Sequence, residues 1–201
     1  MTDHDRTEEK TDDELAREAR DGSLRSFEEL ARRYKRRLFV YLRPRLGSDE
    51  DAEDMVQDTF LKLYRNIGNY DPAYRFSTWL YTSANRLAID SFRKNAVVRD
   101  KLTAEADREL RDPASAAEAG TDESSLWDTA QALGETKFRV LWLRYGEDMT
   151  IEEIAAVLGR TRLAVRVLLH RARTSLAGLL GPDLCREAQP RPGVARQSSG
   201  D

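Results

Sequence analysis

The sequence predicts an all-α protein made of two small helical domains joined by a flexible linker. Charged residues make up 34% of the 201 residues, and the chain has only 11 Gly and 6 Pro, a composition that favours helix over a strand-rich fold. Apolar residues recur at helical spacing in two blocks, residues 24–96 and 126–180. The segment between them, residues 97–125, holds Asp112-Pro113 and Gly120 but no sustained apolar stripe, which is typical of a linker.

Both ends of the chain are expected to lie outside the folded blocks. Residues 1–23 carry four basic and nine acidic side chains, and Leu15 is nearly their only large apolar residue. Such a composition predicts a disordered acidic arm. Residues 181–201 are rich in Pro and Gly and end in a polar run, so we also expect disorder there.

The first block predicts three helices in order. An apolar stripe begins at Phe27 and its helix ends near Pro44 to Gly47. Ser48 or Asp49 can cap a second helix, whose first turns are acidic. Its expected buried stripe consists of Val56, Phe60, Leu63 and Tyr64. After a turn at residues 68–72, a third helix is expected from Phe76 or Ser77 to Arg93, with Trp79 on its core face.

The second block predicts four helices, at residues 126–133, 136–145, 150–158 and 161–180. Thr150 and Glu153 have the spacing of a capping box, Gly159 permits a tight turn, and Thr161 can cap the last helix. This is helix-turn-helix spacing, although an ordinary helical hairpin would show the same features. The last two helices are therefore expected to bind DNA or to form such a hairpin.

Charge and residue usage narrow the function further. The net charge is −3, but residues 24–96 carry fourteen basic and ten acidic side chains, and residues 127–180 carry eight and six. Two basic modules suit contact with an anion, and a solvated helical surface is the alternative. The single cysteine, Cys185, excludes a disulfide framework and fits a reducing compartment. No apolar run approaches ~18 residues, so we expect a cytoplasmic protein without membrane insertion.

The sequence gives little support to an enzyme. His4 and His170 are the only histidines and lie far apart, and the chain has no Gly-rich phosphate loop and no nucleophile motif. The acidic start of the second helix lacks the further ligands of a metal site. We therefore expect no catalytic residue, no metal and no cofactor.

Several runs of residues resemble the extracytoplasmic-function (ECF) sigma factors of bacterial RNA polymerase. Region 2 of that family is similar to AEDMVQDTFLKLY at 52–64, YDP at 70–72, FSTWLY at 76–81 and ANRLAIDSFRK at 84–94. Region 4 is similar to VLWLRY at 140–145, TIEEIAAVLG at 150–159 and HRAR at 170–173. The resemblance implies a sigma factor that binds core RNA polymerase and directs promoter recognition, DNA melting and transcription initiation.

The resemblance also implies partners and site residues. The partners are the clamp helices of the largest polymerase subunit, the flap of the second-largest subunit, promoter DNA, and an anti-sigma factor or a DNA-bound recruiting protein. The polymerase contacts fall on Asp54, Gln57, Asp58 and Lys62. The acidic residues of this helix could instead merely offset its dipole.

Two further sets would bind the promoter. For the −10 element the family positions offer stacking rings, base-edge partners and phosphate-binding cations, namely Asn69, Tyr70, Tyr74, Arg75, Phe76, Ser77, Asn85, Arg86, Arg93 and Lys94. For the −35 element the positions lie on the outer face of the last helix, namely Thr161, Arg162, Leu163, Ala164, Arg166, Val167, His170, Arg171 and Arg173.

The last helix departs from the family pattern at Leu163, Ala164, Val167 and Leu168, where relatives commonly carry small polar or basic residues. Apolar side chains can contact only thymine methyls, so they cannot discriminate bases by hydrogen bonds. The upstream element could be T-rich or weakly specified, or the face could bind a protein. An adaptor that recruits polymerase to a site chosen by another DNA-bound protein is therefore the alternative function, and a stand-alone regulator ranks third because it leaves the first block unexplained.

Overall fold

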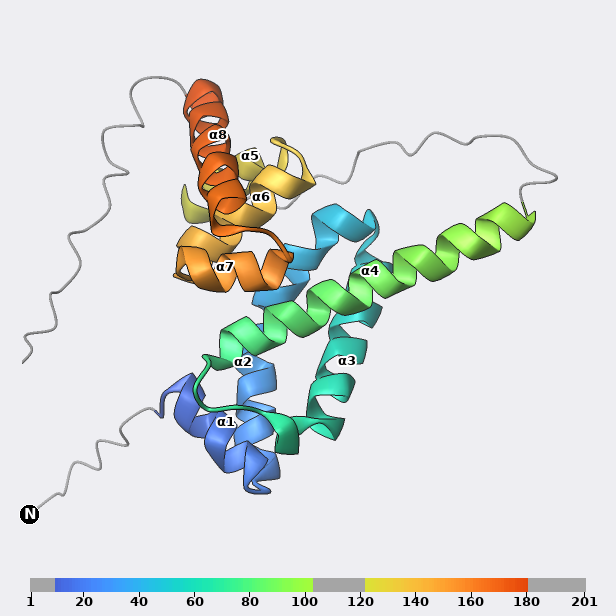
Figure 1. The fold of residues 1–201 in the computed structure, drawn as a ribbon, viewed down its shortest axis with the longest axis vertical. Helices are drawn as coiled ribbons and strands as arrows, with labels where there is room; N and C mark the ends of the chain where they lie inside the picture. The colour runs from blue at the N-terminus through green and yellow to red at the C-terminus, as the bar shows by residue number, and fades with distance from the viewer. Residues whose placement is uncertain (1–9, 103–121, 181–201) are drawn as a thin grey trace, which may run out of the picture.

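The computed structural model describes residues 10–102 and 122–180, and the fold is stated for these residues. They form helices and no strand, as the sequence predicts. The first module consists of α1 (Asp12–Arg20), α2 (Leu24–Leu46), α3 (Asp49–Arg65), a single 3-10 turn η1 (Ile67–Asn69) and α4 (Phe76–Leu102). In Figure 1 these helices fill the lower half of the molecule, with α4 running across its middle.

The core of the first module follows from the apolar stripes of α2 and α3. Leu30, Leu38 and Leu42 of α2 are fully buried, and Val56 and Leu63 of α3 pack against the same core. Serine caps start both helices, because the Ser23 and Ser48 hydroxyls accept the backbone amides of Ser26 and Asp51. One residue differs from the predicted stripe of α3: Tyr64 is 47% exposed.

The expected disorder of the acidic arm is wrong for residues 12–20, which form α1. Thr11 and Glu14 make a reciprocal capping box, and Leu15, Ala16 and Ala19 are buried. The small side chains let α1 pack closely on α2, so one large apolar residue is enough to anchor it. Residues 1–9 lie outside the described part of the chain.

The predicted linker is shorter than expected at both ends. The third predicted helix continues from Arg93 to Leu102, because residues 94–102 contain neither Gly nor Pro to stop it. At the other end α5 (Asp122–Gln131) begins four positions before the expected Leu126. The middle of the linker, residues 103–121, and the tail from residue 181 lie outside the described residues.

The second module consists of α5, α6 (Glu135–Leu141), a π turn η2 (Trp142–Gly146), α7 (Ile151–Leu158) and α8 (Arg162–Leu180). The predicted helix at 136–145 thus begins one residue earlier and ends in a wider turn. Its core contains Phe138, Leu141, Leu143, Ile154 and Val165, all fully buried or nearly so. Trp127 of α5 closes the core through edge contacts with Phe138 and Trp142.

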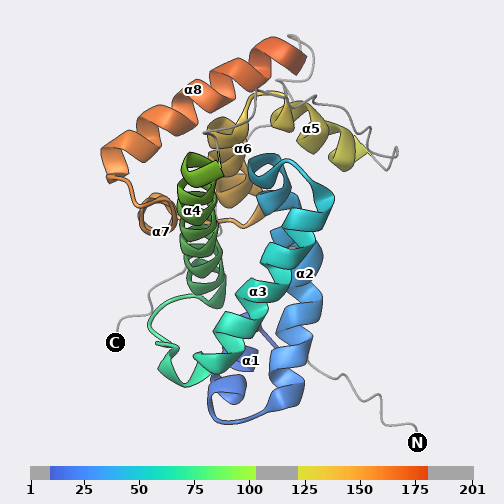
Figure 2. The ribbon, with the colours of Figure 1, turned by 90° about the vertical axis from the view of Figure 1, so that its right-hand side faces the viewer.

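The two modules pack against each other. α7 lies against α4 and α6 touches α2, while α8 lies on the far side of the second module, away from α1 (Figure 2). The buried residues of both modules form one hydrophobic cluster. Within the described residues no helix is long and apolar enough to cross a membrane.

Candidate nucleic-acid interface

The outward face of α3 carries the residues expected to contact polymerase. Asp54, Gln57 and Asp58 are exposed, whereas Lys62 is half-buried. The opposite face is held in the core by Met55, Val56 and Thr59, and the Thr59 hydroxyl donates to the Met55 carbonyl oxygen at 2.7 Å. The three exposed side chains therefore lie on one face, as their spacing predicts.

An apolar groove of about 510 Å³ runs beside this face, between α2 and α3. Gln57 lines it, together with Leu24 and Leu61, each 52% exposed, and Tyr64. Sequence reasoning missed these three residues as part of a surface. The available signal was Leu61, which lies outside the buried stripe of α3 and so has to face solvent.

The turn after α3 combines buried and exposed rings. Tyr70 and Phe76 were expected to stack on a base, but they are 3% and 0% exposed and form a cluster with Tyr34 and Trp79. They are core residues here, because their rings fill the space between α1, α2 and α4. Tyr74, by contrast, is 64% exposed. Of the three predicted stacking rings, it is the one that a base can reach in this arrangement.

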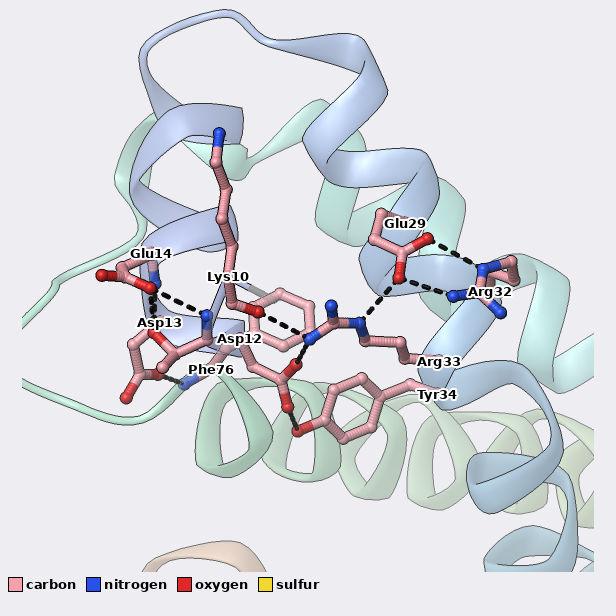
Figure 3. A network of polar contacts seen from close by, with 10 residues as sticks. Lys10, Asp12, Asp13, Glu14, Glu29, Arg32, Arg33, Tyr34 and Phe76 are labelled. Atoms are coloured by element: carbon pink, nitrogen blue, oxygen red, sulfur yellow. Dashed lines mark hydrogen bonds and ion pairs between the residues drawn. The ribbon is translucent and has the colours of Figure 1, made fainter. Parts of the chain in front are cut away.

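The acidic residues of α1 hold this turn in place, as Figure 3 shows. An Asp13 carboxylate oxygen accepts the Phe76 backbone amide at 2.9 Å, at the start of α4. Asp12 accepts from the Tyr34 hydroxyl at 2.6 Å and from Arg33 at 2.8 Å. Burial raises the pKa of Tyr34, and the hydrogen bond to Asp12 raises it further. The arm that the sequence presents as a mobile acidic segment thus fixes the start of α4 at Phe76.

Ser77 and Asn85, two other −10 candidates, are also buried. The Ser77 hydroxyl has no hydrogen-bond partner among the described residues. Both ends of the Asn85 amide are occupied: its oxygen accepts from Arg45 at 2.6 Å and from Arg139, and its nitrogen donates to the Val157 carbonyl at 2.7 Å. Because Arg139 and Val157 belong to the second module, that module covers Asn85.

The remaining −10 candidates are more accessible. Asn69, Arg86 and Arg93 are exposed, and the side chain of Lys94 lies outside the described residues. Arg75 is half-exposed and reaches the second module, where it donates to the Asp148 carbonyl oxygen at 3.1 Å and lies 4.0 Å from Glu153. The predicted −10 residues therefore divide into a buried set and an accessible set, and the second module contacts two of them, Arg75 and Asn85.

Glu147 is the centre of the contact between the modules, and sequence reasoning did not find it. Its side chain is 0% exposed and accepts from Arg37 at 2.7 and 3.1 Å and from the Tyr81 hydroxyl at 2.5 Å. Burial raises the pKa of Glu147, against the hydrogen bonds from Tyr81 and Arg37 that favour the carboxylate. No sequence signal points to this contact, because its partners lie more than sixty residues away along the chain.

The helix-turn-helix forms as its sequence predicts. Thr150 and Glu153 make both hydrogen bonds of the capping box. Gly159 ends α7 in the left-handed region, at φ +62° and ψ 38°, which a residue with a Cβ rarely adopts. The Thr161 hydroxyl then accepts the Ala164 amide at 3.2 Å and caps α8. Two short caps around one glycine thus fix the angle at which α8 leaves α7.

The outer face of α8 is open to solvent. Val165, Leu169 and Ala172 face the core, and Ala164 is half-buried. The other −35 candidates are exposed, namely Thr161, Arg162, Leu163, Arg166, Val167, His170, Arg171 and Arg173. Leu163 is 70% and Val167 43% exposed, so the apolar character expected of this face is present on the surface.

The described residues offer no metal-binding cluster of three or more His, Cys, Asp or Glu side chains. The arrangement suits binding: exposed cations on α4 and α8 can contact phosphates, and the polar face of α3 lies beside an apolar groove.

Comparison with known proteins identifies both modules. Residues 30–97 match the Sigma-70 region 2 family, and residues 124–176 match Sigma-70 region 4. The sigma factor CarQ of Myxococcus xanthus is 36% identical over 165 residues, which cover 81% of this chain and 93% of CarQ. The ECF sigma factor BldN of Streptomyces coelicolor is 29% identical over 174 residues, which cover 85% of this chain and 66% of BldN.

A solved structure also resembles this chain over both modules. CnrH, determined in complex with the cytosolic domain of CnrY, is 28% identical with a TM-score of 0.57, and the match covers 86% of this chain and 98% of CnrH. Sigma factors are transcription initiation factors rather than enzymes, and the adaptor alternative is not favoured. The chain belongs to the ECF sigma factors, which direct RNA polymerase in the initiation of transcription.

Proposed function

We propose that this sigma factor binds core polymerase through the outward face of α3 and reads a bipartite promoter through α4 with its preceding turn and through α8. The observation that carries the polymerase contact is the combination of exposed Asp54, Gln57 and Asp58 with the apolar groove beside them. Interfaces commonly pair an apolar centre with a polar rim, and this surface has both. Such a function belongs in the cytoplasm, the compartment expected from the sequence.

A binding titration of the full chain with purified core polymerase tests the contact, and run-off transcription reports its effect on initiation. Gln57→Ala with Asp58→Ala, and separately Leu61→Ser, should weaken binding to core by about fivefold or more, because truncation of a central interface residue can cost over 1 kcal/mol. Asp128→Ala is the matched control, since Asp128 is an exposed aspartate on α5, away from the groove. Unchanged binding in both α3 variants would contradict the proposal.

The −10 part of the proposal requires the modules to separate. Asn85 is buried between Arg45, Arg139 and Val157, so a base edge cannot reach its amide in the arrangement described here. Tyr74, Arg86 and Arg93 are accessible without any movement. Reading by Asn85 therefore follows only after α7 leaves α4, and the accessible residues make the first contacts.

An anti-sigma factor is the further partner that we propose. CnrH was determined with the cytosolic domain of CnrY, and CnrH resembles this chain over most of its length. A pull-down from cell extract with the full chain tests this proposal, because it reports polymerase and a second polypeptide together. The extract should come from cells that do not express the gene for this factor. Recovery of polymerase subunits alone from that extract would contradict the proposed anti-sigma partner.

A further inference from the structure

The outward face of α8 has an aliphatic strip at its centre. Val165, Leu169 and Ala172 are buried and define the inward direction. At about 100° per residue, Leu163 and Val167 each point about 160° away from Val165, on opposite sides. They are therefore adjacent, one turn apart, in the first two turns of the helix. Their exposed fractions, 70% and 43%, agree with this placement.

Basic side chains flank the strip on both sides. Measured around the axis of α8 from Val165, Arg166 lies about 100° to one side and Arg171 about 120° to the other. Both are exposed, and neither has an ion-pair partner within residues 10–102 and 122–180. Arg162 also flanks the strip and is paired only with exposed Glu152, at 3.4 Å. An aliphatic centre with Arg162 and Arg166 on one side and Arg171 on the other fits a groove with anionic walls, which is the chemistry of the DNA major groove.

The helix-turn-helix architecture gives the same orientation. In this motif the second helix lies in the major groove, and the residues of its N-terminal part contact base edges. Leu163 and Val167 occupy that part of α8. The face is open even while the second module covers Asn85, because α7 is the helix of that module that packs on α4, and Leu163 and Val167 of α8 are exposed.

We propose that Leu163 and Val167 select the upstream promoter element by contacting thymine methyl groups; this inference rests on the proposed function of α8. The thymine C5 methyl is the apolar group that a base pair presents in the major groove. An aliphatic side chain placed against any other base edge would cover a donor or acceptor without pairing it, which is unfavourable. Recognition by this strip thus rewards thymine at the contacted positions and penalises the other bases.

The test uses holoenzyme assembled from the full chain and core polymerase. Holoenzyme first selects binding sites from a duplex library with a random upstream segment. Each thymidine of the selected element is then replaced by deoxyuridine, which removes only the methyl group. Burial of one methyl-sized group supports about a fourfold change in affinity, so we expect about that loss at one or two positions.

Side-chain variants test which residue contacts each thymine methyl group. Leu163→Ser should weaken binding to the thymidine element and abolish the effect of deoxyuridine at one position, and Val167→Ser should do so at a neighbouring position. Leu179→Ser is the matched control, because Leu179 is an exposed leucine, 55% exposed, near the other end of α8. It should keep the full deoxyuridine effect. Thermal unfolding of each variant checks that the fold is retained.

The outcomes separate this inference from the proposed function. Selection of an element that tolerates deoxyuridine everywhere would overturn thymine reading and leave the proposed role of α8 intact. An equal deoxyuridine effect in wild type, Leu163→Ser and Val167→Ser would also overturn it, since other residues would then read the methyl. Failure to select any upstream element would overturn both. If Leu163→Ser weakened promoter binding only when a second protein was bound to the same DNA, the outward face of α8 would contact that protein instead of DNA. This result would overturn thymine reading.

Discussion

At the scale of single residues, exposure separates rings that support the fold from rings that can reach a base. Tyr70 and Tyr74 are four positions apart in a motif that resembles the −10 reader, yet one is 3% and the other 64% exposed. The Tyr70 hydroxyl donates to the Tyr74 carbonyl oxygen at 2.8 Å, so the buried ring also fixes the backbone of the exposed one. The sequence motif places both tyrosines in the turn, but it does not show which of the two is exposed.

Alanine substitution should separate these two roles. Tyr70→Ala should lower the free energy of unfolding by about 3–5 kcal/mol, the range for loss of a buried aromatic ring. Tyr74→Ala should change it by less than about 0.5 kcal/mol, as is usual at the surface, while it weakens binding to single-stranded −10 DNA. Urea unfolding and fluorescence anisotropy measure the two effects. Similar destabilisation by both substitutions would contradict the assignment of Tyr74 to DNA binding alone.

Glu29 gives a pH-dependent prediction at the same scale. Hydrogen bonds from Arg32 and Arg33 lower its pKa to about 2 (Figure 3). A carboxyl whose pKa is depressed by folding stabilises the native state above the ordinary value of 4.5, and that contribution is lost as the pH falls toward 2. Glu29→Gln should therefore reduce the loss of stability between pH 5 and about pH 2, measured by urea unfolding against pH. Identical pH profiles for wild type and variant would refute the pairing.

At the scale of elements, α1 is the helix that sequence reasoning missed. Its nine residues offer one large apolar side chain, too few for a recognisable stripe, and its acidic residues look solvated. Their partners, Arg33, Tyr34 and the Phe76 amide, lie on α2 and α4. The longer helices were predictable because capping residues and apolar periodicity are local, whereas α1 depends on packing between segments far apart in the chain.

A cavity substitution tests whether α1 is part of the fold. Leu15→Ala should lower the free energy of unfolding by about 2–5 kcal/mol, because Leu15 is 5% exposed and packs in the shared core. Arg17→Ala, at an exposed position of the same helix, is the control and should change it by less than about 0.5 kcal/mol. If the two substitutions were equally mild, the arm would be mobile after all, as composition alone suggests.

At the scale of the whole molecule, the two modules form a closed arrangement. Sequence motifs identify each module and many of its surface residues, but they carry no information on which surfaces meet. Asn85 illustrates this: its motif predicts a contact with a base, but in the structure its side-chain amide is hydrogen-bonded to Arg139 and to the Val157 carbonyl. Glu147 is the converse: it belongs to no motif, yet it accepts hydrogen bonds from Arg37 and Tyr81 across the interface.

Removal of the Glu147 carboxylate should open the molecule. Glu147→Ala leaves the buried Tyr81 hydroxyl without its acceptor, at a cost of about 1–3 kcal/mol, and removes the ion pair of Glu147 with the partly exposed Arg37. After Cys185 is replaced by Ser, fluorophores at exposed Arg36 and Thr174, each changed to Cys, report the distance between α2 and α8. Glu152→Ala is the control, since Glu152 pairs with Arg162 inside the second module. An unchanged distance in Glu147→Ala would show that apolar contacts alone hold the modules together.

The same labels test the pH dependence of closure. Because burial raises the pKa of Glu147 above its ordinary value of 4.5, the closed form binds the proton more tightly than an open form in which this carboxyl is solvated. Acidification through the raised pKa should therefore favour the closed form, with the full effect reached below pH 4.5 and none above the raised value. Glu147→Gln removes this titration but keeps an acceptor for Tyr81, so its inter-module distance should lose the pH dependence. Opening of the wild-type molecule on acidification would contradict this prediction. It would mean that the charged Glu147 carboxylate stabilises the closed form more than the protonated carboxyl does.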